Sequence, residues 1–258
     1  MTTLLDIITV TKDDFEGVTG TIRSTRQLRS IPGIHQIIVD SSATETQQLL
    51  QEFIAGEQHL TYIWQQPSGI APAFNLGLRL SQAEWVWFLN GGDEVCPDID
   101  AEKLLYLVKN SRADAIVFDV EFTPSHTRLE HPPMWAMWPL IPSTWLPHQA
   151  TLTRRRLYEQ YGTFNESFHI AMDVEFWVRC FSKHVIVDTI SIPLALFDVT
   201  GISRTQRERS MYEVTRLVIM HFWQFVKIWF YKRWLYDMLP KLLRRWVAIF
   251  WQKIARNR

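Results

Sequence analysis

Residues 85–93, WVWFLNGGD, are a short apolar run that ends in Asn90, two glycines and Asp93. The first five of these residues are apolar without alternation, which is typical of a strand buried on both faces of a sheet. Two glycines and an aspartate directly after such a run indicate a tight turn. The segment therefore predicts a central strand of a parallel sheet, with a carboxylate at its carboxyl end.

Apolar runs of similar length alternate with segments of helical periodicity on both sides of this stretch. The predicted strands are residues 4–11, 33–40, 60–64, 85–90 and 115–120. The predicted helices are residues 13–30, which starts with an Asp13/Glu16 capping signal, 44–55, 73–81 and a helix capped by Asp100 that runs to about residue 110. Strands joined by helices in this order predict an α/β fold with a mostly parallel central sheet flanked by helices.

The ends of the predicted strands are where a ligand is expected, because parallel sheets bind ligands at the carboxyl ends of their strands. These ends carry Thr11, Asp40, residues 65–69 and residues 90–93. The sequence contains no G-x-G-x-x-G after the first strand, no G-x-x-x-x-G-K-[ST] and no G-x-S-x-G. Carboxylates at strand ends remain, and they suit a metal-held diphosphate and a catalytic base.

The pattern changes after residue 120. Residues 121–150 hold six prolines and predict loops, in which Trp135, Trp138 and Trp145 either pack or line a cleft. Helices are predicted over residues 153–161 and 172–181, and a strand over residues 185–197. From about residue 205 the chain is predicted to be helical to its end, with an interruption at Pro240.

Composition excludes several classes of protein. Hydrophobic residues make up 47% of the 258 residues and charged residues 21%, which is ordinary for a globular protein. The two cysteines, Cys96 and Cys180, lack the spacing of a metal site or a disulfide framework. Residues 1–8 read as a first strand and not as a signal peptide. We expect a cytoplasmic protein.

Charge is distributed unevenly along the chain. The net charge is zero, but residues 221–258 hold nine Lys/Arg and a single acid, Asp237. Residues 241–254 place apolar side chains on one helical face and basic ones on the other. A basic amphipathic helix with tryptophans predicts binding to the inner membrane face; packing on the domain or on a second subunit is the alternative. The acidic remainder has no reason to bind nucleic acid.

Eight segments resemble the motifs of family 2 glycosyltransferases, in the order that the family shows. They run from about residue 4 to residue 204 and are ITVT at 8–11 with the preceding Ile7, IIVDSSAT at 37–44, SGIAPAFNLG at 68–77, WFLNGGD at 87–93, HQAT at 148–151, GTFNESF at 162–168, AMDVEFWVR at 171–179 and GIS at 201–203.

The resemblance implies a GT-A fold and a transferase that moves a sugar from a nucleotide-sugar donor to a glycan or lipid-linked acceptor, with inversion, in bacterial polysaccharide biosynthesis. It implies a catalytic domain over residues 1–204, with a donor half at 1–120 and an acceptor half at 121–204. Residues 205–258 follow as a basic helical tail. Mn²⁺ or Mg²⁺ is the implied cofactor.

The resemblance also assigns roles to residues. Asp173 is the expected base, with Glu175 as its rival, and Asp93 the expected metal ligand. The expected donor-binding residues are Thr11, Asp40, Gly69, Asn75, Asn90 and Arg204. The expected acceptor-side residues are Trp145, His148, Gln149 and Glu175.

The sequence departs from the family pattern in its acidic motifs. Ser41, Ser68 and Pro72 replace acids, and Asn90 and Gly92 stand where DxD segments carry them. A GT-A module that binds without turnover is therefore an alternative, and a nucleotidyltransferase is a more distant one. Single residues also have structural readings: an Asx-turn for Asp40, a helix cap for Asp173 and packing for His148.

Overall fold

The computed structural model describes residues 3–123, 125, 127–129, 146–181, 183, 185–198 and 206–221. The chain divides into two compact units, Met1–Thr215 and Arg216–Arg258. The first unit holds the sheet and every described candidate site residue. The predicted division at residue 204 stays a prediction.

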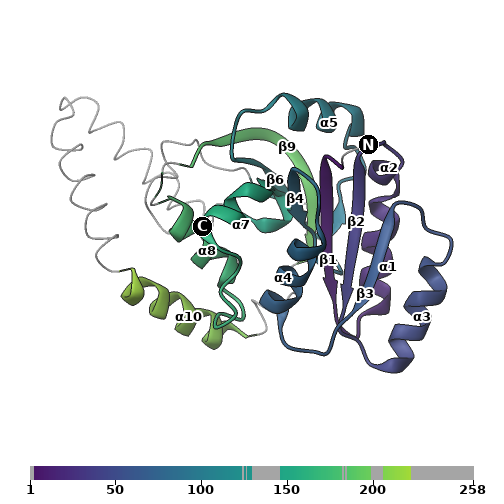
Figure 1. The fold of residues 1–258 in the computed structure, drawn as a ribbon, viewed down its shortest axis with the longest axis horizontal. Helices are drawn as coiled ribbons and strands as arrows, with labels where there is room; N and C mark the ends of the chain where they lie inside the picture. Colours follow the sequence, from purple (N-terminus) through teal and green to yellow (C-terminus); the bar gives the residue numbers. More distant parts are fainter. Residues whose placement is uncertain are drawn as a thin grey trace. The chain divides into compact units, whose positions relative to one another are not determined.

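The first half of the sheet contains four parallel strands in the order β3-β2-β1-β4 (Figure 1). They are β1 (Leu5–Thr11), β2 (Ile34–Asp40), β3 (Leu60–Trp64) and β4 (Trp85–Phe88). Thr11 is level with Asp40, and Asp40 with Trp64. The carboxyl ends of these strands therefore lie at one edge, as the apolar runs predicted.

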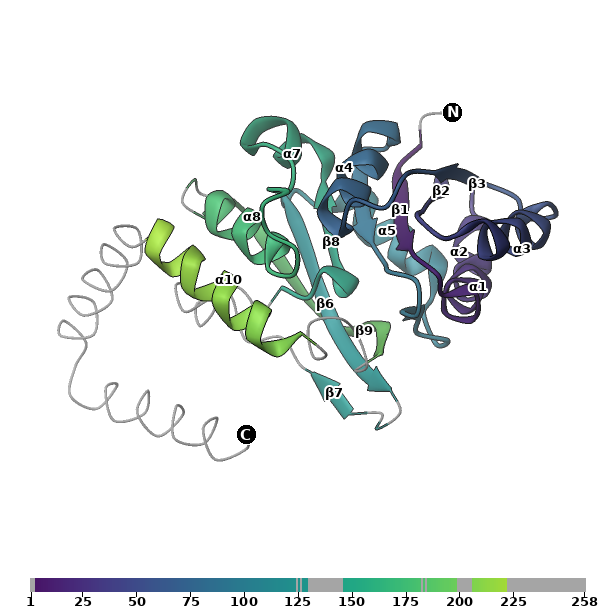
Figure 2. The ribbon, with the colours of Figure 1, turned by 90° about the horizontal axis from the view of Figure 1, so that it is seen from below.

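Helices cover both faces of these strands (Figures 1 and 2). They are α1 (Phe15–Ser24), α2 (Arg26–Arg29), α3 (Thr44–Ile54), α4 (Ile70–Leu80) and α5 (Ala101–Asn110). Val18 and Ile22 of α1 pack with Ile38 and Leu50, so α1 and α3 share a face. On the other face α4 approaches β1 closely: a Cβ atom on Gly77 would lie 2.4 Å from Cγ2 of Ile8.

The first predicted helix differs from the observed one at both ends. Asp14 is its N-cap, with a carboxylate that accepts a hydrogen bond from the Gly17 N–H at 2.9 Å. Asp13 has a φ of 53° and accepts a hydrogen bond from the Ala43 N–H at 2.7 Å. The helix ends at Ser24, and Thr25 separates it from α2. The predicted cap was wrong by one residue because Asp13 binds the loop after β2.

The second half of the sheet is mixed, in the order β4-β8-β6-β9-β5 with β7 paired to β6. Its strands are β5 (Glu94–Val95), β6 (Ala115–Thr123), β7 (Thr127–Leu129), β8 (Thr151–Arg154) and β9 (Val187–Asp198). Only the β6–β9 pair is parallel in this half. The fold class is confirmed, and β6 and β9 correspond to predicted strands; the strands β5, β7 and β8 were not predicted.

Residues 153 and 154 were predicted as the start of a helix, but with residues 151 and 152 they form β8 instead. They bridge β4 and β6 and carry the fully buried Leu152. Two threonines in this stretch favour a strand over a helix. The helix α7 (Arg155–Tyr161) follows directly, and α8 (Met172–Phe181) has the predicted bounds.

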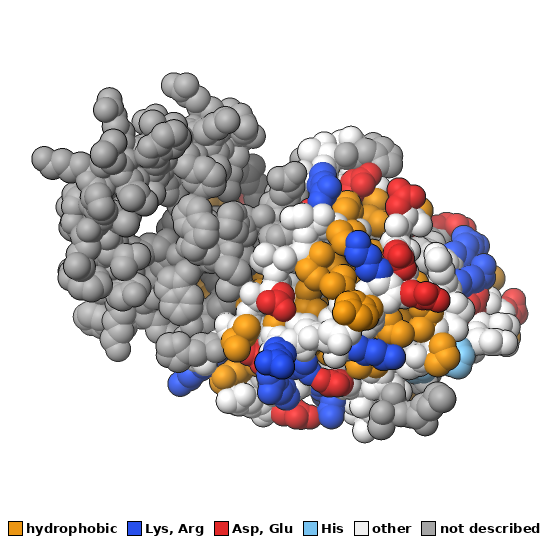
Figure 3. Space-filling model, turned by 90° about the horizontal axis from the view of Figure 1, so that it is seen from above, with side chains coloured by type: hydrophobic (Ala, Val, Ile, Leu, Met, Phe, Trp, Pro, Cys, Tyr) orange, Lys and Arg blue, Asp and Glu red, His pale blue; other side chains and the backbone are white. Residues whose placement is uncertain are grey.

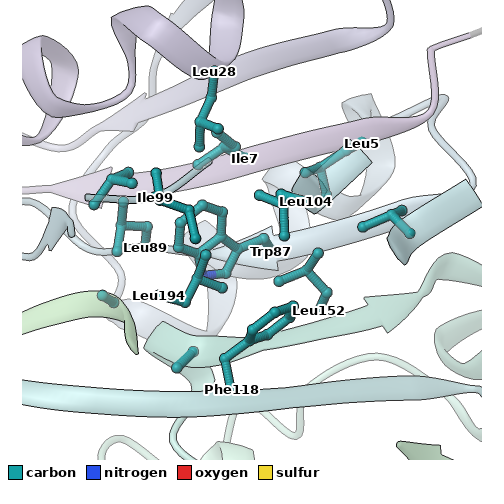
Figure 4. Close-up of a cluster of buried hydrophobic side chains, with 14 of the residues drawn as sticks. Leu5, Ile7, Leu28, Trp87, Leu89, Ile99, Leu104, Phe118, Leu152 and Leu194 are labelled. Atoms are coloured by element: carbon teal, nitrogen blue, oxygen red, sulfur yellow. The ribbon is translucent and has the colours of Figure 1, made fainter. Parts of the chain in front are cut away.

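The main core lies between one face of the sheet, including β1, β4, β6, β8 and β9, and the helices α2 and α5 (Figure 4). Trp87 is completely buried there, and its Nε1–H donates a hydrogen bond to the Gln149 carbonyl at 2.7 Å. This bond ties the short 3-10 helix η2 (His148–Ala150) to β4. The core thus fixes the backbone that carries His148.

The last described helix is α10 (Arg207–Met220). No described helix combines the length and the apolar character needed to span a membrane. The predicted amphipathic tail lies, beyond residue 221, outside the described residues. On the face drawn in Figure 3, basic and acidic side chains of the described residues are interspersed.

Candidate functional site

The predicted strand ends do meet. The Ser41 N–H donates to the Thr11 carbonyl at 2.9 Å, and the Gln65 N–H donates to the Asp40 carbonyl at 2.8 Å. The Thr11 hydroxyl and the Gln65 side-chain nitrogen are buried without a hydrogen-bond partner among the described residues. Because buried polar atoms are normally paired, these two atoms mark a place where a polar ligand can bind.

Asp40 is completely buried at the end of β2. Its Oδ1 accepts from the Ser42 N–H at 2.8 Å, and its Oδ2 accepts from the Tyr62 hydroxyl at 2.7 Å. Burial, and then this hydrogen bond to Asp40, raise the pKa of Tyr62, so the phenol stays a donor. The bond from Ser42 forms the Asx-turn that was the structural alternative for Asp40. Each carboxylate oxygen still has a second lone pair that can accept from a ligand.

The turn after β4 is held from outside the segment. The Thr21 hydroxyl donates to the Asp93 carbonyl at 2.7 Å and accepts from the Gly92 N–H at 3.1 Å. Gly92 has a φ of 97°, in the region that favours glycine. The Asp93 residue is 4% exposed. Its carboxylate is thus placed by a rigid turn at the strand end.

A chain of hydrogen bonds joins this turn to the predicted base. The Asn90 Nδ2 lies 3.0 Å from Nε2 of His148, and the His148 Nδ1 lies 3.1 Å from Oδ2 of Asp173. With the amide nitrogen of Asn90 as the donor, Nε2 of His148 accepts and Nδ1–H faces Asp173. Nδ1–H then donates to Asp173. The donor-side and acceptor-side motifs therefore meet through the imidazole of His148 and the carboxylate of Asp173.

Asp173 combines orientation with access. Its Oδ1 accepts from the Val174 N–H at 2.8 Å and its Oδ2 from His148, so the carboxylate has one orientation. The side chains of His148 and Asp173 are each 18% exposed. A hydroxyl group can thus approach the remaining lone pairs of Asp173, as a general base requires.

Glu175 has different surroundings from those expected of an acceptor-side residue. It is 3% exposed, and its two oxygens lie 2.8 and 3.0 Å from Nε of Arg179. Arg179 in turn donates to the Tyr161 carbonyl and, at 2.7 Å, to the Thr163 carbonyl. The ion pair holds the turn between α7 and α8, which explains why Glu175 faces inward. This contrast favours Asp173 as the base.

Three other predicted site residues, Gly69, Asn75 and Gln149, are defined by their backbone conformation or by hydrogen bonds to other segments. Gly69 precedes α4 with a φ of 112°. Asn75 bonds to the N–H and C=O of Phe164 and to Glu166, each at 2.9 Å. Both N–H groups of the Asn75 side chain are thereby occupied. Its oxygen keeps one lone pair that can accept from a nucleotide-sugar. Gln149 is buried and contributes its carbonyl to Trp87.

Two predicted residues, Trp145 and Arg204, lie outside the described residues, as do Trp135 and Trp138. Within the described ranges, no group of three or more His, Cys, Asp or Glu side chains could hold a metal ion. Within the described turn at residues 90–93, the side chains that can offer oxygen to a divalent ion are the acid Asp93 and the amide Asn90.

Sequence reasoning missed Thr21 and Tyr62, which hold Asp93 and Asp40 from other elements. Thr21 is a completely buried residue on α1, and a threonine on the buried face of a predicted helix is a signal that could have found it. Tyr62 lies in β3 two residues before its end. In the predicted strand Tyr62 and Trp64 are two positions apart and so lie on the same face, which was the available signal.

Comparisons with known proteins agree with this geometry. The family model described as Glycosyl transferase family 2 matches residues 6–179, more than half of the 258 residues. Similar proteins include two uncharacterized glycosyltransferases of Mycobacterium tuberculosis, from strains CDC 1551 and H37Rv. Each is 25% identical over 213 residues, which cover 80% of this chain and 79% of the relative.

Solved structures share the fold at low sequence identity. S. aureus TarS 1–349 in complex with UDP gives a TM-score of 0.64 at 17% identity, over 83% of this chain and 64% of that one. The mannosyltransferase PcManGT from Pyrobaculum calidifontis, in complex with GDP-Man and Mn²⁺, gives 0.64 at 15% identity, over 86% and 65%. The chain thus spans less than two thirds of the length of either. The likeness confirms the predicted GT-A fold.

Proposed function

Since the chain belongs to glycosyl transferase family 2 and is a glycosyltransferase, we propose that it moves a sugar from a nucleotide-sugar donor to a hydroxyl group of a glycan or lipid-linked acceptor. The observation that carries the proposal is the hydrogen-bonded chain Asn90–His148–Asp173. It connects the turn at the donor end of the sheet to an oriented carboxylate. Transfer in bacterial polysaccharide biosynthesis is part of this proposal.

In the proposed reaction Asp173 is the general base. The acceptor oxygen attacks the anomeric carbon while the bond from that carbon to the diphosphate oxygen breaks. Asp173 takes the hydroxyl proton, and the nucleoside diphosphate leaves with the bonding electron pair. We place the base on the side of the anomeric carbon opposite the diphosphate, so the proposed transfer inverts the configuration of that carbon.

A divalent cation, Mn²⁺ or Mg²⁺, belongs to the proposal. Asn90 Oδ1 is a buried oxygen without a hydrogen-bond partner among the described residues, in the same turn as the carboxylate of Asp93. Amide and carboxylate oxygens suit both ions. These residues therefore fit an ion whose coordination shell is completed by diphosphate oxygens and water. When bound, the ion offsets the charge that develops on the leaving group. The structure of PcManGT with GDP-Man and Mn²⁺ supports such an ion.

A screen of nucleotide-sugars tests the proposal. We expect at least one UDP- or GDP-sugar to bind, and its slow hydrolysis to release the nucleoside diphosphate when Mn²⁺ or Mg²⁺ is present. Because a single acid holds the ion weakly, EDTA should reduce both binding and hydrolysis. Calorimetry and nucleotide release measure the two effects. Binding without turnover of any donor, with or without a glycan acceptor, would instead support the binding module.

We also propose that residues 221–258 attach the enzyme to the inner membrane face, where a lipid-linked acceptor would lie. The segment holds nine basic residues and five tryptophans. Each Lys or Arg near an anionic surface contributes about 1 kcal/mol, and burial of apolar side chains adds a part that salt does not screen. The two contributions make binding only partly sensitive to salt.

The double variant Arg244→Glu/Arg245→Glu should bind anionic liposomes at least about 30-fold more weakly than the unaltered protein, because it loses two attractive charges and adds two repulsive ones. Liposome flotation measures the binding. Lys103→Glu/Lys109→Glu, which makes the same charge change at exposed positions of α5, is the matched control. Equal loss in both pairs would show a general charge effect. Failure of the unaltered protein to float would favour packing of the tail on protein.

A further inference from the structure

The carboxylate of Glu213 in α10 binds three successive backbone N–H groups that lie more than 40 residues earlier in the chain. Its Oε2 accepts from Ile170 at 2.8 Å and from Ala171 at 2.9 Å, and its Oε1 accepts from His169 at 2.9 Å. The side chain of Glu213 is 3% exposed. The hydrogen bonds of this buried acid go to backbone donors, which indicates that Glu213 holds the backbone at residues 169–171 in place.

These three N–H groups stand directly before α8, which begins at Met172. The Ala171 carbonyl accepts from the Glu175 N–H at 3.0 Å, so Ala171 is the residue from which the helix starts. Helix starts leave backbone donors unpaired, and a capping side chain usually helps to satisfy them. Alanine has no such side chain. The N–H groups that Glu213 binds precede this helix start, and the Val174 N–H in the first turn is bonded to Asp173 instead. Glu213 therefore does not act as the cap; it ties the segment directly before α8 to α10.

Glu213 remains a carboxylate in this position. Burial raises the pKa of Glu213. The hydrogen bonds from Ala171, Ile170 and His169 lower it by more, so the pKa lies below its usual range. The other charged or titratable groups that face it are Arg209, 3.4 Å away on the same helix, and the His169 imidazole. Glu213 and the three N–H groups that it binds are called the clamp below. In this clamp the carboxylate is an anion held by backbone dipoles and by the flanking Arg209.

Asp173 is the second residue of α8, so the start of this helix fixes where its carboxylate lies. Its 3.1 Å hydrogen bond to His148 depends on that position. We infer that Glu213 is a positioning residue for Asp173, and that α10 thereby contributes to turnover without touching the substrate. The inference rests on the proposed function, in which Asp173 is the base.

Glu213→Gln should lower kcat by about 10- to 100-fold and leave the donor KM within about twofold, because a small displacement of a base is costly while the donor contacts at β1, β2 and β4 are unaffected. The amide group puts a donor against backbone donors and loosens the clamp. Steady-state kinetics on the full chain measures kcat and the donor KM separately. Glu208→Gln makes the same change at an exposed position of α10 and should leave both constants unchanged.

Chemical rescue separates positioning from general stability. Glu213→Ala should lose at least as much kcat as Glu213→Gln, and acetate should restore part of it by occupying the vacated clamp, whereas chloride at the same ionic strength should not. Variants with the kcat of the unaltered enzyme would overturn the inference. So would loss of donor binding together with kcat, or loss of the cooperative melting transition, because each assigns Glu213 to the domain as a whole. Absence of donor binding and turnover in the unaltered protein would instead overturn the proposed function.

Discussion

Asp173→Asn is expected to lower sugar transfer by about 10²- to 10⁴-fold while the donor still binds with an affinity within about twofold of the original. The asparagine keeps the shape of the side chain and can still accept from the Val174 N–H. It cannot take a proton from the acceptor. Its amide nitrogen would also face Nδ1–H of His148, so the chain to Asn90 would contain two opposed donors. Transfer rates and calorimetry with the nucleotide measure the two expectations.

Glu175→Gln is the comparison that tests the choice of base. It weakens the ion pair with Arg179 that holds the turn after α7. We expect a lower melting temperature and a nearly unchanged transfer rate per folded molecule. If Asp173→Asn transfers sugar at the original rate and Glu175→Gln does not, Glu175 is the base and the exposure argument is wrong.

The strand ends were predictable from sequence for a simple reason. Continuous apolar runs joined by helices predict a parallel sheet, and a parallel sheet places all its carboxyl ends at one edge. The observed register, with Thr11 level with Asp40 and Asp40 level with Trp64, follows from that rule. The candidate donor half therefore needed no information from distant parts of the chain.

The contacts between motifs were not predictable in the same way. Asn90 and His148 are separated by 58 positions, and β8, which brings η2 beside β4, was not predicted as a strand. The clamp of Glu213 is harder still, because backbone N–H groups at residues 169–171 leave no mark in the sequence. Local rules also failed at Asp13, whose carboxylate serves the loop after β2 while Asp14 caps the helix. In each case a long-range hydrogen bond decided between local alternatives.

Asp93→Ala should weaken metal-dependent binding of a nucleoside diphosphate by at least about 100-fold, because no other acid of the described DxD-like segment is available to the ion. The backbone bonds between the turn and Thr21 do not involve this side chain, so the turn itself should persist. Calorimetry with UDP and GDP, in Mn²⁺ and in EDTA, measures the effect. The variant should bind as weakly in Mn²⁺ as the unaltered protein does in EDTA.

Asp98→Ala removes an exposed carboxylate from the same region and should bind as the unaltered protein does. Melting curves of both variants distinguish a lost ligand from a lost fold. A folded Asp93→Ala protein that keeps its response to Mn²⁺ would remove Asp93 from the site. If it also kept sugar transfer, the charge of the leaving diphosphate would have to be offset elsewhere. Arg204, which the sequence predicts to contact the diphosphate, would then be the residue to change next.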